Sequence, residues 1–343
     1  MEYGAIDLHM RRSEIRIEDE AGRLVLARRI DTTRADFERA FGGRPRMRIL
    51  IESATESEWV AQCLEALGHE VIVADPNYLP MYGQRSRRVK TDKRDVAALT
   101  TACRTGTYRS ASRVSAAQRT RRQELRVRRH LVQIRTRTIS LIRSVVRQDG
   151  RRVPRGASED MVARLDRMSL PPALQAVIAP MKEVIAAVQT TLDRIEARIE
   201  QIAETDVAAQ RLMTAPGVGP IVALTYLAVL DTPDRFGGDA RRASAFLGLV
   251  PSEDSSAERQ HKGRITKTGP PELRSLLIQA SWVIWRSRSA DGAALRTWAH
   301  ALAARRGRRI AVVALARRLS RILFAMWRDQ TEFTRRAQTA VAA

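Results

Sequence analysis

The chain has 343 residues, of which 44% are hydrophobic, and it carries a formal net charge of +22 at pH 7. This hydrophobic fraction is enough for a folded core, so it excludes a globally disordered protein, and the length suits two domains. The charge far exceeds the magnitude of about 2–8 that solubility requires, and it predicts a polyanionic partner such as nucleic acid.

The chain contains two cysteines, Cys63 and Cys103, which form no CxxC pair that would indicate a zinc site. Such sparse cysteine usage suits a reducing cytoplasm, and Asp7 stands where a signal peptide would be apolar. The most apolar runs, 221–230 and 310–316, are too short to span a bilayer. We therefore expect a cytoplasmic protein with no membrane partner.

The first hundred residues predict an α/β domain. Isoleucine alternates with charged residues in 13–18, which is typical of a strand, and glycines mark the ends of several elements. The predicted order is three strands, helix, strand, helix, strand and helix, over 4–8, 13–18, 24–30, 33–41, 47–51, 57–67, 70–74 and about 91–104. This is the element order of a ribonuclease-H-like domain.

Two long helices are predicted next, over 115–148 and about 180–204. The first is rich in arginine and includes Arg126 and Arg129 as candidate nucleic-acid contacts. The second has apolar residues at coiled-coil spacing: Val184, Val188, Leu192, Ile195, Ile199 and Ile202. This seam predicts self-association, and packing against the first helix of the same chain is the alternative.

A mostly helical domain is predicted after residue 204. Its helices fall at 221–230, 243–249, 272–285 and 308–327, with a loop at 231–239 and a polar stretch without strong periodicity at 251–267. The whole chain is thus expected to be α/β plus α, divided into 1–114, 115–204 and 205–335, with a disordered tail at 336–343.

Four acidic residues stand at the ends of predicted elements. Asp7 lies in the first strand, Glu52 ends the fourth strand, and Asp92 and Asp95 share one face at the start of a helix. Singly, each has an ordinary explanation, such as an N-cap for Asp92. Together they predict a metal site, because paired Mg²⁺ or Mn²⁺ ions held by carboxylates can align a phosphodiester for displacement.

Two further segments are candidates for phosphate contact. Gly217 and Gly219 lie in a Pro-Gly-Val-Gly-Pro turn whose backbone N–H groups can meet a phosphate, as in helix-hairpin-helix DNA contacts, and an ordinary tight turn is the alternative.

The other segment contains Ser255 and Ser256. A serine hydroxyl is a weak nucleophile unless its proton is removed or its alkoxide is stabilised. Arg264, Lys267 and Arg274 follow closely and can hold a phosphate. On chemistry alone, a plain solvent loop is the alternative.

These motifs together resemble the DEDD-type insertion-sequence transposases called bridge recombinases, which include the pilin-gene invertases. The resemblance covers nearly the whole chain and rests on Ile-Asp-Leu at 6–8, Ile-Glu-Ser at 51–53, Lys-Thr-Asp-Lys-Arg-Asp at 90–95, Pro-Gly-Val-Gly-Pro at 216–220, and Gly-Leu-Val-Pro, Ser-Ser, Gly-Arg-Ile-Thr-Lys and Leu-Arg between 248 and 274.

The resemblance implies a RuvC-like N-terminal domain whose acids are Asp7, Glu52, Asp92 and Asp95. It also implies a helical C-terminal transposase domain with a nucleophilic serine. The family places this serine before a glycine, so Ser256 is the matching position and Ser255 the reserve, with Ala257 in place of the glycine.

The same resemblance implies a reaction and its partners. The serine attacks DNA to form a 5′-phosphoserine link, and metal held by the acids activates it. A structured noncoding RNA guides a homo-oligomer, a dimer or tetramer, on its DNA. The alternatives are a RuvC-like nuclease that uses water and a non-catalytic nucleic-acid-binding protein.

Overall fold

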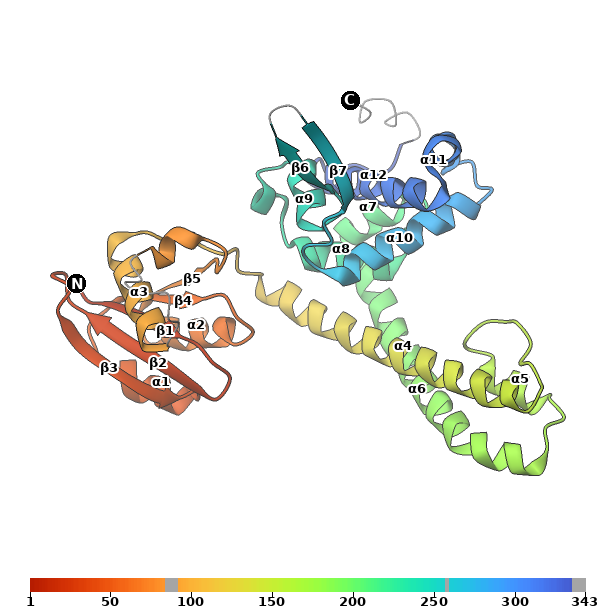
Figure 1. The fold of residues 1–343 in the computed structure, drawn as a ribbon, viewed down its shortest axis with the longest axis horizontal. Helices are drawn as coiled ribbons and strands as arrows, with labels where there is room; N and C mark the ends of the chain where they lie inside the picture. Colours follow the sequence, from red (N-terminus) through yellow and green to blue (C-terminus); the bar gives the residue numbers. More distant parts are fainter. Residues whose placement is uncertain (84–91, 257–258, 335–343) are drawn as a thin grey trace. The chain divides into compact units, whose positions relative to one another are not determined.

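A computed structural model of the chain describes residues 1–83, 92–256 and 259–334, apart from the side chains of 254–262. It contains two compact units, Met1–Arg113 and Val114–Ala343, which are described separately (Figure 1). The expected disordered tail, 336–343, lies outside the described residues. Over the described part of the chain, none of the helices combines the length and apolar character needed to cross a membrane.

The N-terminal unit is a sheet with helices on both faces (Figure 1). Its element order confirms the predicted one. The elements are β1 (Tyr3–Asp7), β2 (Arg12–Glu18), β3 (Leu24–Asp31), α1 (Arg34–Phe41), β4 (Arg48–Glu52), α2 (Ser57–Ala66), β5 (Glu70–Ala74), the 3-10 helix η1 (Leu79–Tyr82) and α3 (Asp92–Thr105).

The sheet has the strand order β3-β2-β1-β4-β5 within the described residues. Strands β1, β2 and β3 form an antiparallel meander, whereas β4 pairs in parallel with both β1 and β5. Alternate residues face opposite sides. On β4, Ile49 and Ile51 pack with Phe37 of α1, while Leu50 packs with Leu99 of α3. The sheet is therefore buried on both faces.

The second unit begins with a helical hairpin of α4 (Ala116–Gln148) and α6 (Pro172–Thr205), with α5 (Met161–Asp166) in the connection (Figure 1). The sequence analysis did not predict α5. It predicted that the second long helix begins at about Pro180, which is wrong, because α6 begins at Pro172. Pro180 lies inside the helix, although it lacks the N–H of a normal helical residue. Burial of Ile178 and Ile185 in the hairpin core stabilises the helix on both sides of it.

The predicted coiled-coil seam lies partly within the hairpin. The buried α6 positions Ile178, Ile185, Leu192 and Ile199 are seven residues apart. Ile178 and Ile185 share a core with Ile139 of α4, and Ile199 shares one with Leu125. For Leu192 and Ile199 the same-chain alternative is therefore correct, because α6 packs along α4. Val184, by contrast, is 45% exposed.

Three other arginines of α4 face α6 within the hairpin, and the sequence analysis did not predict these contacts. They are seven residues apart and contact α6 or its end: Arg121 Nη1 lies 2.9 Å from Asp206 Oδ2, Arg128 Nε donates to Glu196 Oε1 at 2.8 Å, and Arg135 Nη1 donates to Gln189 Oε1 at 2.7 Å. The descending partner numbers show that the helices run antiparallel. These arginines stabilise the hairpin itself.

The rest of this unit is mainly helical, around a core that includes Tyr226, Leu277 and Phe324. Its elements are α7 (Val207–Met213), α8 (Pro220–Leu230), the 3-10 helix η2 (Pro233–Phe236), α9 (Ala240–Phe246), β6 (Pro251–Ser256), β7 (Arg259–Ile265), α10 (Pro271–Arg286), α11 (Ala293–Arg306) and α12 (Arg308–Arg328).

Three differences from the sequence prediction have local causes. The stretch 251–267, for which no element was predicted, contains the antiparallel hairpin β6–β7, whose polar residues give no hydrophobic alternation. Helix α9 begins three residues earlier than predicted because the Asp239 side chain accepts a hydrogen bond from the Arg241 N–H. Helix α11 was missed because only Leu295 and Ala299 are buried, so it has no broad apolar stripe.

Candidate metal centre and nucleic-acid interface

Two of the predicted acids end neighbouring parallel strands. Strands β1 and β4 pair Ile6 with Ile51, and each strand ends one residue later, at Asp7 and Glu52. Because side chains alternate, Asp7 shares a face with Ala5, which packs on the side of α3. The strands thus direct both carboxylates toward α3.

Helix α3 supplies the other two acids in its first turn. Asp92 is half-exposed, whereas Asp95 is only 5% exposed. Acidic side chains in the first turn of a helix interact favourably with the helix dipole. The structure therefore brings all four predicted acids to one end of the sheet.

His9 joins this cluster, although the sequence prediction did not include it. Its Nε2 lies 3.6 Å from Asp7 Oδ2 and 3.7 Å from Asp92 Oδ1. One ligand atom each from Asp7, His9 and Asp92 lie within 4.8 Å of one another. A signal was present in the sequence, since His9 follows Asp7 by two residues just after β1.

The pKa of Asp7 shows how the cluster interacts. Burial of the Asp7 carboxyl raises its pKa above the ordinary value, and His9 opposes the rise. Three nearby carboxylates raise the Asp7 pKa further: Asp92, Asp95 and Glu52. This concentration of hard oxygen donors, with one imidazole, has an excess of negative charge that a divalent cation would relieve.

Two neighbouring side chains fix the positions of Glu52 and Asp92. The Tyr82 hydroxyl donates to Glu52 Oε2 at 2.6 Å. Arg29 Nη2 donates to Asp92 Oδ2 at 3.2 Å, and its Nε lies 3.4 Å from Glu14 Oε1. These contacts join residues far apart in the sequence, so local patterns could not predict them.

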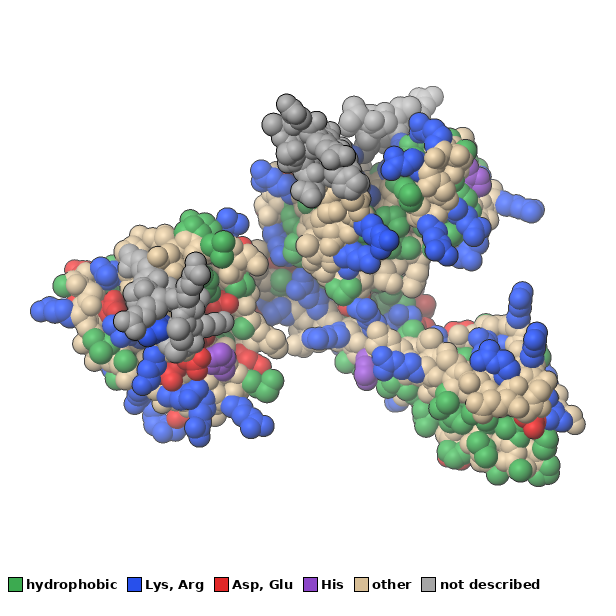
Figure 2. Space-filling model, viewed as in Figure 1, with side chains coloured by type: hydrophobic (Ala, Val, Ile, Leu, Met, Phe, Trp, Pro, Cys, Tyr) green, Lys and Arg blue, Asp and Glu red, His purple; other side chains and the backbone are tan. Residues whose placement is uncertain are grey.

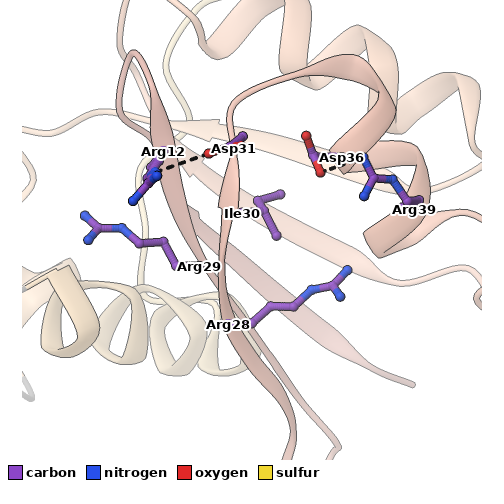
Figure 3. A pocket seen from close by; sticks show the side chains of 7 residues that line it. All are labelled: Arg12, Arg28, Arg29, Ile30, Asp31, Asp36 and Arg39. Atoms are coloured by element: carbon purple, nitrogen blue, oxygen red, sulfur yellow. Dashed lines mark hydrogen bonds and ion pairs between the residues drawn. The ribbon is translucent and has the colours of Figure 1, made fainter.

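A strip of arginines continues from the acids to the edge of the sheet. Arg12 and Arg29 line a hollow beside His9 and Asp92, and both also line an adjoining hollow of about 360 Å³ at β3 (Figure 3).

Inside the adjoining hollow, Arg12 pairs with Asp31 at 3.2 Å and Arg39 with Asp36 at 3.0 Å, as Figure 3 shows. Arg28 is exposed there and has no ion pair among the described residues. The hollow is therefore a cationic surface next to the acids.

The predicted nucleophile region lies in the β6–β7 hairpin. The backbone pairs Ser255 with Gln260 and Ser256 with Arg259, and the side chains of these serines lie outside the described residues. Of the predicted phosphate contacts, Arg264 is exposed.

The other two predicted contacts of this region differ in their surroundings. Lys267 is exposed, with a positive φ of 56°. Arg274 Nη1 donates to the carbonyl oxygens of Leu247 and Thr268 at 2.9 and 3.0 Å. Arg274 therefore fixes the base of the β-hairpin.

The glycines of the predicted phosphate turn differ in their surroundings. Gly217 has a positive φ of 75°, and a Cβ there would lie 2.7 Å from the Ala280 carbonyl oxygen, so close packing on α10 explains this glycine. A Cβ at Gly219 would have open space around it. Only Gly219 leaves room for a ligand.

On α4, Arg126 is exposed, while Arg129 Nη1 lies 3.5 Å from Glu272 Oε2. Groups of Lys and Arg side chains are also spread over the visible face of both units (Figure 2). The arginines that remain exposed are available to a polyanion.

Comparison with known proteins gives consistent matches over both units. A family model described as "Transposase" of the IS110 DEDD type matches residues 5–149, and the model "Transposase IS116/IS110/IS902 family" matches residues 209–296. Together they include all four acids and the β6–β7 hairpin.

Curated relatives agree over most of their length. A "Probable family 20 transposase" of Pseudomonas aeruginosa is 28% identical over 307 residues, or 87% of this chain and 89% of the relative. The transposase for insertion sequence element IS1111A of Coxiella burnetii is 25% identical, covering 92% of this chain and 86% of its own. The transposase for IS1328 of Yersinia enterocolitica is 25% identical, covering 96% and 98%. The chain belongs to the IS110/IS116/IS902 family of insertion-sequence transposases.

Proposed function

We propose that this transposase cuts and rejoins DNA at a metal centre formed by four acids: Asp7, Glu52, Asp92 and Asp95. The observation that carries the proposal is the gathering of ligand atoms from Asp7, His9 and Asp92 within 4.8 Å of one another. Burial raises the pKa of the Asp7 carboxyl, and the other three acids raise it further. Such a cluster is unfavourable without a cation, and its oxygen donors suit Mg²⁺ or Mn²⁺. The sheet order is consistent with a RuvC-like domain.

The side chains around the acids have separate tasks in this proposal. Asp7 and Asp92 supply oxygen ligands, and His9 stands within reach of both. A divalent ion bound there would lower the pKa of an attacking hydroxyl and offset charge on the phosphodiester. Arg12 and Arg28 bind phosphates that flank the reacting one, since guanidinium groups pair well with phosphate oxygens.

We further propose that Ser256 is the nucleophile, with Ser255 in reserve. Its Oγ forms a bond to phosphorus, the bond from phosphorus to the 3′ oxygen breaks, and that oxygen leaves as a hydroxyl after taking up a proton. The 5′-phosphoserine link conserves the energy of the phosphodiester, so rejoining needs no external energy source. The support is the position of the serine within the family motif between 248 and 274.

The partners in this proposal are DNA, a structured noncoding guide RNA and further copies of the chain in a dimer or tetramer. Support for the nucleic acids is the net charge of +22 and the exposed arginines such as Arg126. Support for self-association comes from large apolar side chains left exposed on the hairpin, which include Val177 and Val184 of α6 and Val127 and Leu141 of α4.

The metal centre is tested by strand cleavage of an element-end DNA in Mg²⁺ and in EDTA. Asp7→Asn should reduce cleavage about a thousandfold, because several kcal/mol of transition-state stabilisation are lost, while DNA binding persists. Asp19→Asn, in a turn of the same unit, is the matched control and should cleave normally. Cleavage by Asp7→Asn at the wild-type rate would reject the metal centre.

The serine is tested in the same assay. If a Ser255→Ala/Ser256→Ala variant hydrolyses DNA at the wild-type rate, the protein is a nuclease that uses water. If no form of the protein shows Mg²⁺-dependent cleavage, it is a non-catalytic binder.

A further inference from the structure

Three arginines gather where α9 packs against α12. Arg317 and Arg321 lie one turn apart on α12, and Arg241 lies at the start of α9. The two helices are joined by the hydroxyl groups of Ser244 and Ser320, whose oxygens are 2.9 Å apart. We refer to Arg241, Arg317 and Arg321 as the α9–α12 arginine cluster.

The cluster is electrostatically unfavourable by itself. Burial lowers the pKa of Arg317, and the charges of Arg321 and Arg241 lower it further. Within the described residues, no carboxylate pairs with any of the three guanidinium groups. Like charges at this spacing repel, so a bound anion would stabilise the arrangement.

Hydrogen bonding leads to the same conclusion. The Nε atoms of Arg317 and Arg321 are buried and have no hydrogen-bond partner among the described residues. Two other arginines of this unit show the contrast: Arg328 binds Asp329 and the Gly238 carbonyl, and Arg274 binds two carbonyl oxygens. Buried donors are normally satisfied, so the unsatisfied donors of the cluster indicate an acceptor that comes from a ligand.

We propose that the α9–α12 arginine cluster binds the phosphate backbone of duplex DNA. Several guanidinium forks with no internal anion match the oxygens of adjacent phosphates, and DNA is the polyanion on which a transposase acts. The identity of this ligand rests on the proposed function. Helix α12 lies beyond both regions matched by the family models, 5–149 and 209–296.

The test is the salt dependence of binding to a duplex DNA of unrelated sequence, measured by fluorescence anisotropy with the full chain. Each phosphate contact contributes about −0.9 to the log–log slope, so Arg317→Gln/Arg321→Gln should make the slope shallower by about 1.8. Between 50 and 200 mM salt, the affinity gap between variant and wild type should therefore shrink about tenfold.

A charge-matched control separates the cluster from general positive charge. Arg305→Gln/Arg306→Gln removes two exposed charges at the end of α11 and should change the slope much less. An equal change in the two double variants would overturn the proposal. So would unchanged DNA binding by Arg317→Gln/Arg321→Gln together with weaker binding to a duplex RNA of the same length.

Two further measurements separate a loss of DNA binding from unfolding of the variant and from failure of the proposed function. Without nucleic acid, the Tm of Arg317→Gln/Arg321→Gln should equal or exceed that of the wild type, because the repulsion is removed, so weaker binding cannot be attributed to unfolding. Binding is measured in EDTA with Asp7→Asn beside the wild type. Failure of DNA cleavage would reject the proposed function, whereas an unchanged salt slope would reject only this cluster.

Discussion

Asp7 is the residue on which the proposed chemistry depends most. It lies in an apolar strand, is mostly buried, and faces three carboxylates and one histidine. A buried carboxylate among like charges destabilises the fold unless something compensates it. The conflict is therefore expected to disappear when a divalent cation binds or when Asp7 loses its charge.

Asp7→Asn should consequently raise the Tm of the protein in EDTA and abolish its stabilisation by Mg²⁺. Wild-type protein at a Mg²⁺ concentration of 100 times Kd should gain about 2.7 kcal/mol of unfolding free energy. Asp19→Asn should retain this gain. Thermal unfolding with and without Mg²⁺ measures both effects, and a wild-type Mg²⁺ response in Asp7→Asn would show that the ion binds elsewhere.

The sequence predicted the four acids better than it predicted the residues that contact them. Asp7, Glu52, Asp92 and Asp95 each stand at the end of a strand or the start of a helix, and the topology of a parallel pair brings such ends together.

Arg29 and Tyr82 could not be predicted in this way. Arg29 pairs with Asp92 across 63 positions, and Tyr82 reaches Glu52 across 30. Nothing in their local patterns distinguishes them from surface residues.

The α4–α6 hairpin is the element whose sequence pattern has two physical interpretations. Apolar residues at coiled-coil spacing are equally suited to a partner in the same chain or in another copy. In the structure the buried positions seven residues apart face α4, while Val177 and Val184 remain exposed. Periodicity identifies a seam, whereas the partner depends on how the connection through α5 folds back.

Leu192→Ala tests the inner seam. Leu192 is fully buried, so its truncation should lower the free energy of unfolding by about 2–5 kcal/mol. Val184→Ala, at an exposed position of the same helix, should change it by less than about 0.5 kcal/mol. Urea unfolding followed by far-UV circular dichroism compares the two, and equal effects would contradict the observed packing.

Val177→Glu/Val184→Glu tests the outer face of the same helix. Both side chains are exposed, so the variant should fold normally, but charge on this face should disfavour association of two hairpins. We expect a smaller oligomer by light scattering with an unchanged helical signal. An oligomer of wild-type size would show that other surfaces hold the copies together.

For the whole molecule, the charge of +22 was the clearest sequence signal, but it did not identify which arginines bind a ligand. Arg121 and Arg128 are paired with acids inside the hairpin, whereas Arg317 and Arg321 have no acidic partner in the described part of the chain. Amino-acid composition does not distinguish these two groups of arginines. Only three-dimensional packing separates arginines that stabilise the fold from those available to a phosphate.

The guide-RNA proposal concerns the intact assembly. Protein purified after co-expression with the sequence of its own element should retain one discrete RNA derived from the element's end. Sequencing the retained RNA, with the Arg126→Gln variant alongside, measures this directly. Host RNA in proportion to its cellular abundance would instead indicate binding through charge alone.

In the proposed reaction a serine and a metal centre together exchange DNA strands. The most direct measurement traps the reaction on a suicide DNA substrate and locates the modified peptide by mass spectrometry. We predict an adduct on Ser256 in wild-type protein with Mg²⁺, and none in EDTA or in Asp7→Asn. Efficient strand exchange by Ser255→Ala/Ser256→Ala without any adduct would rule out the serine mechanism.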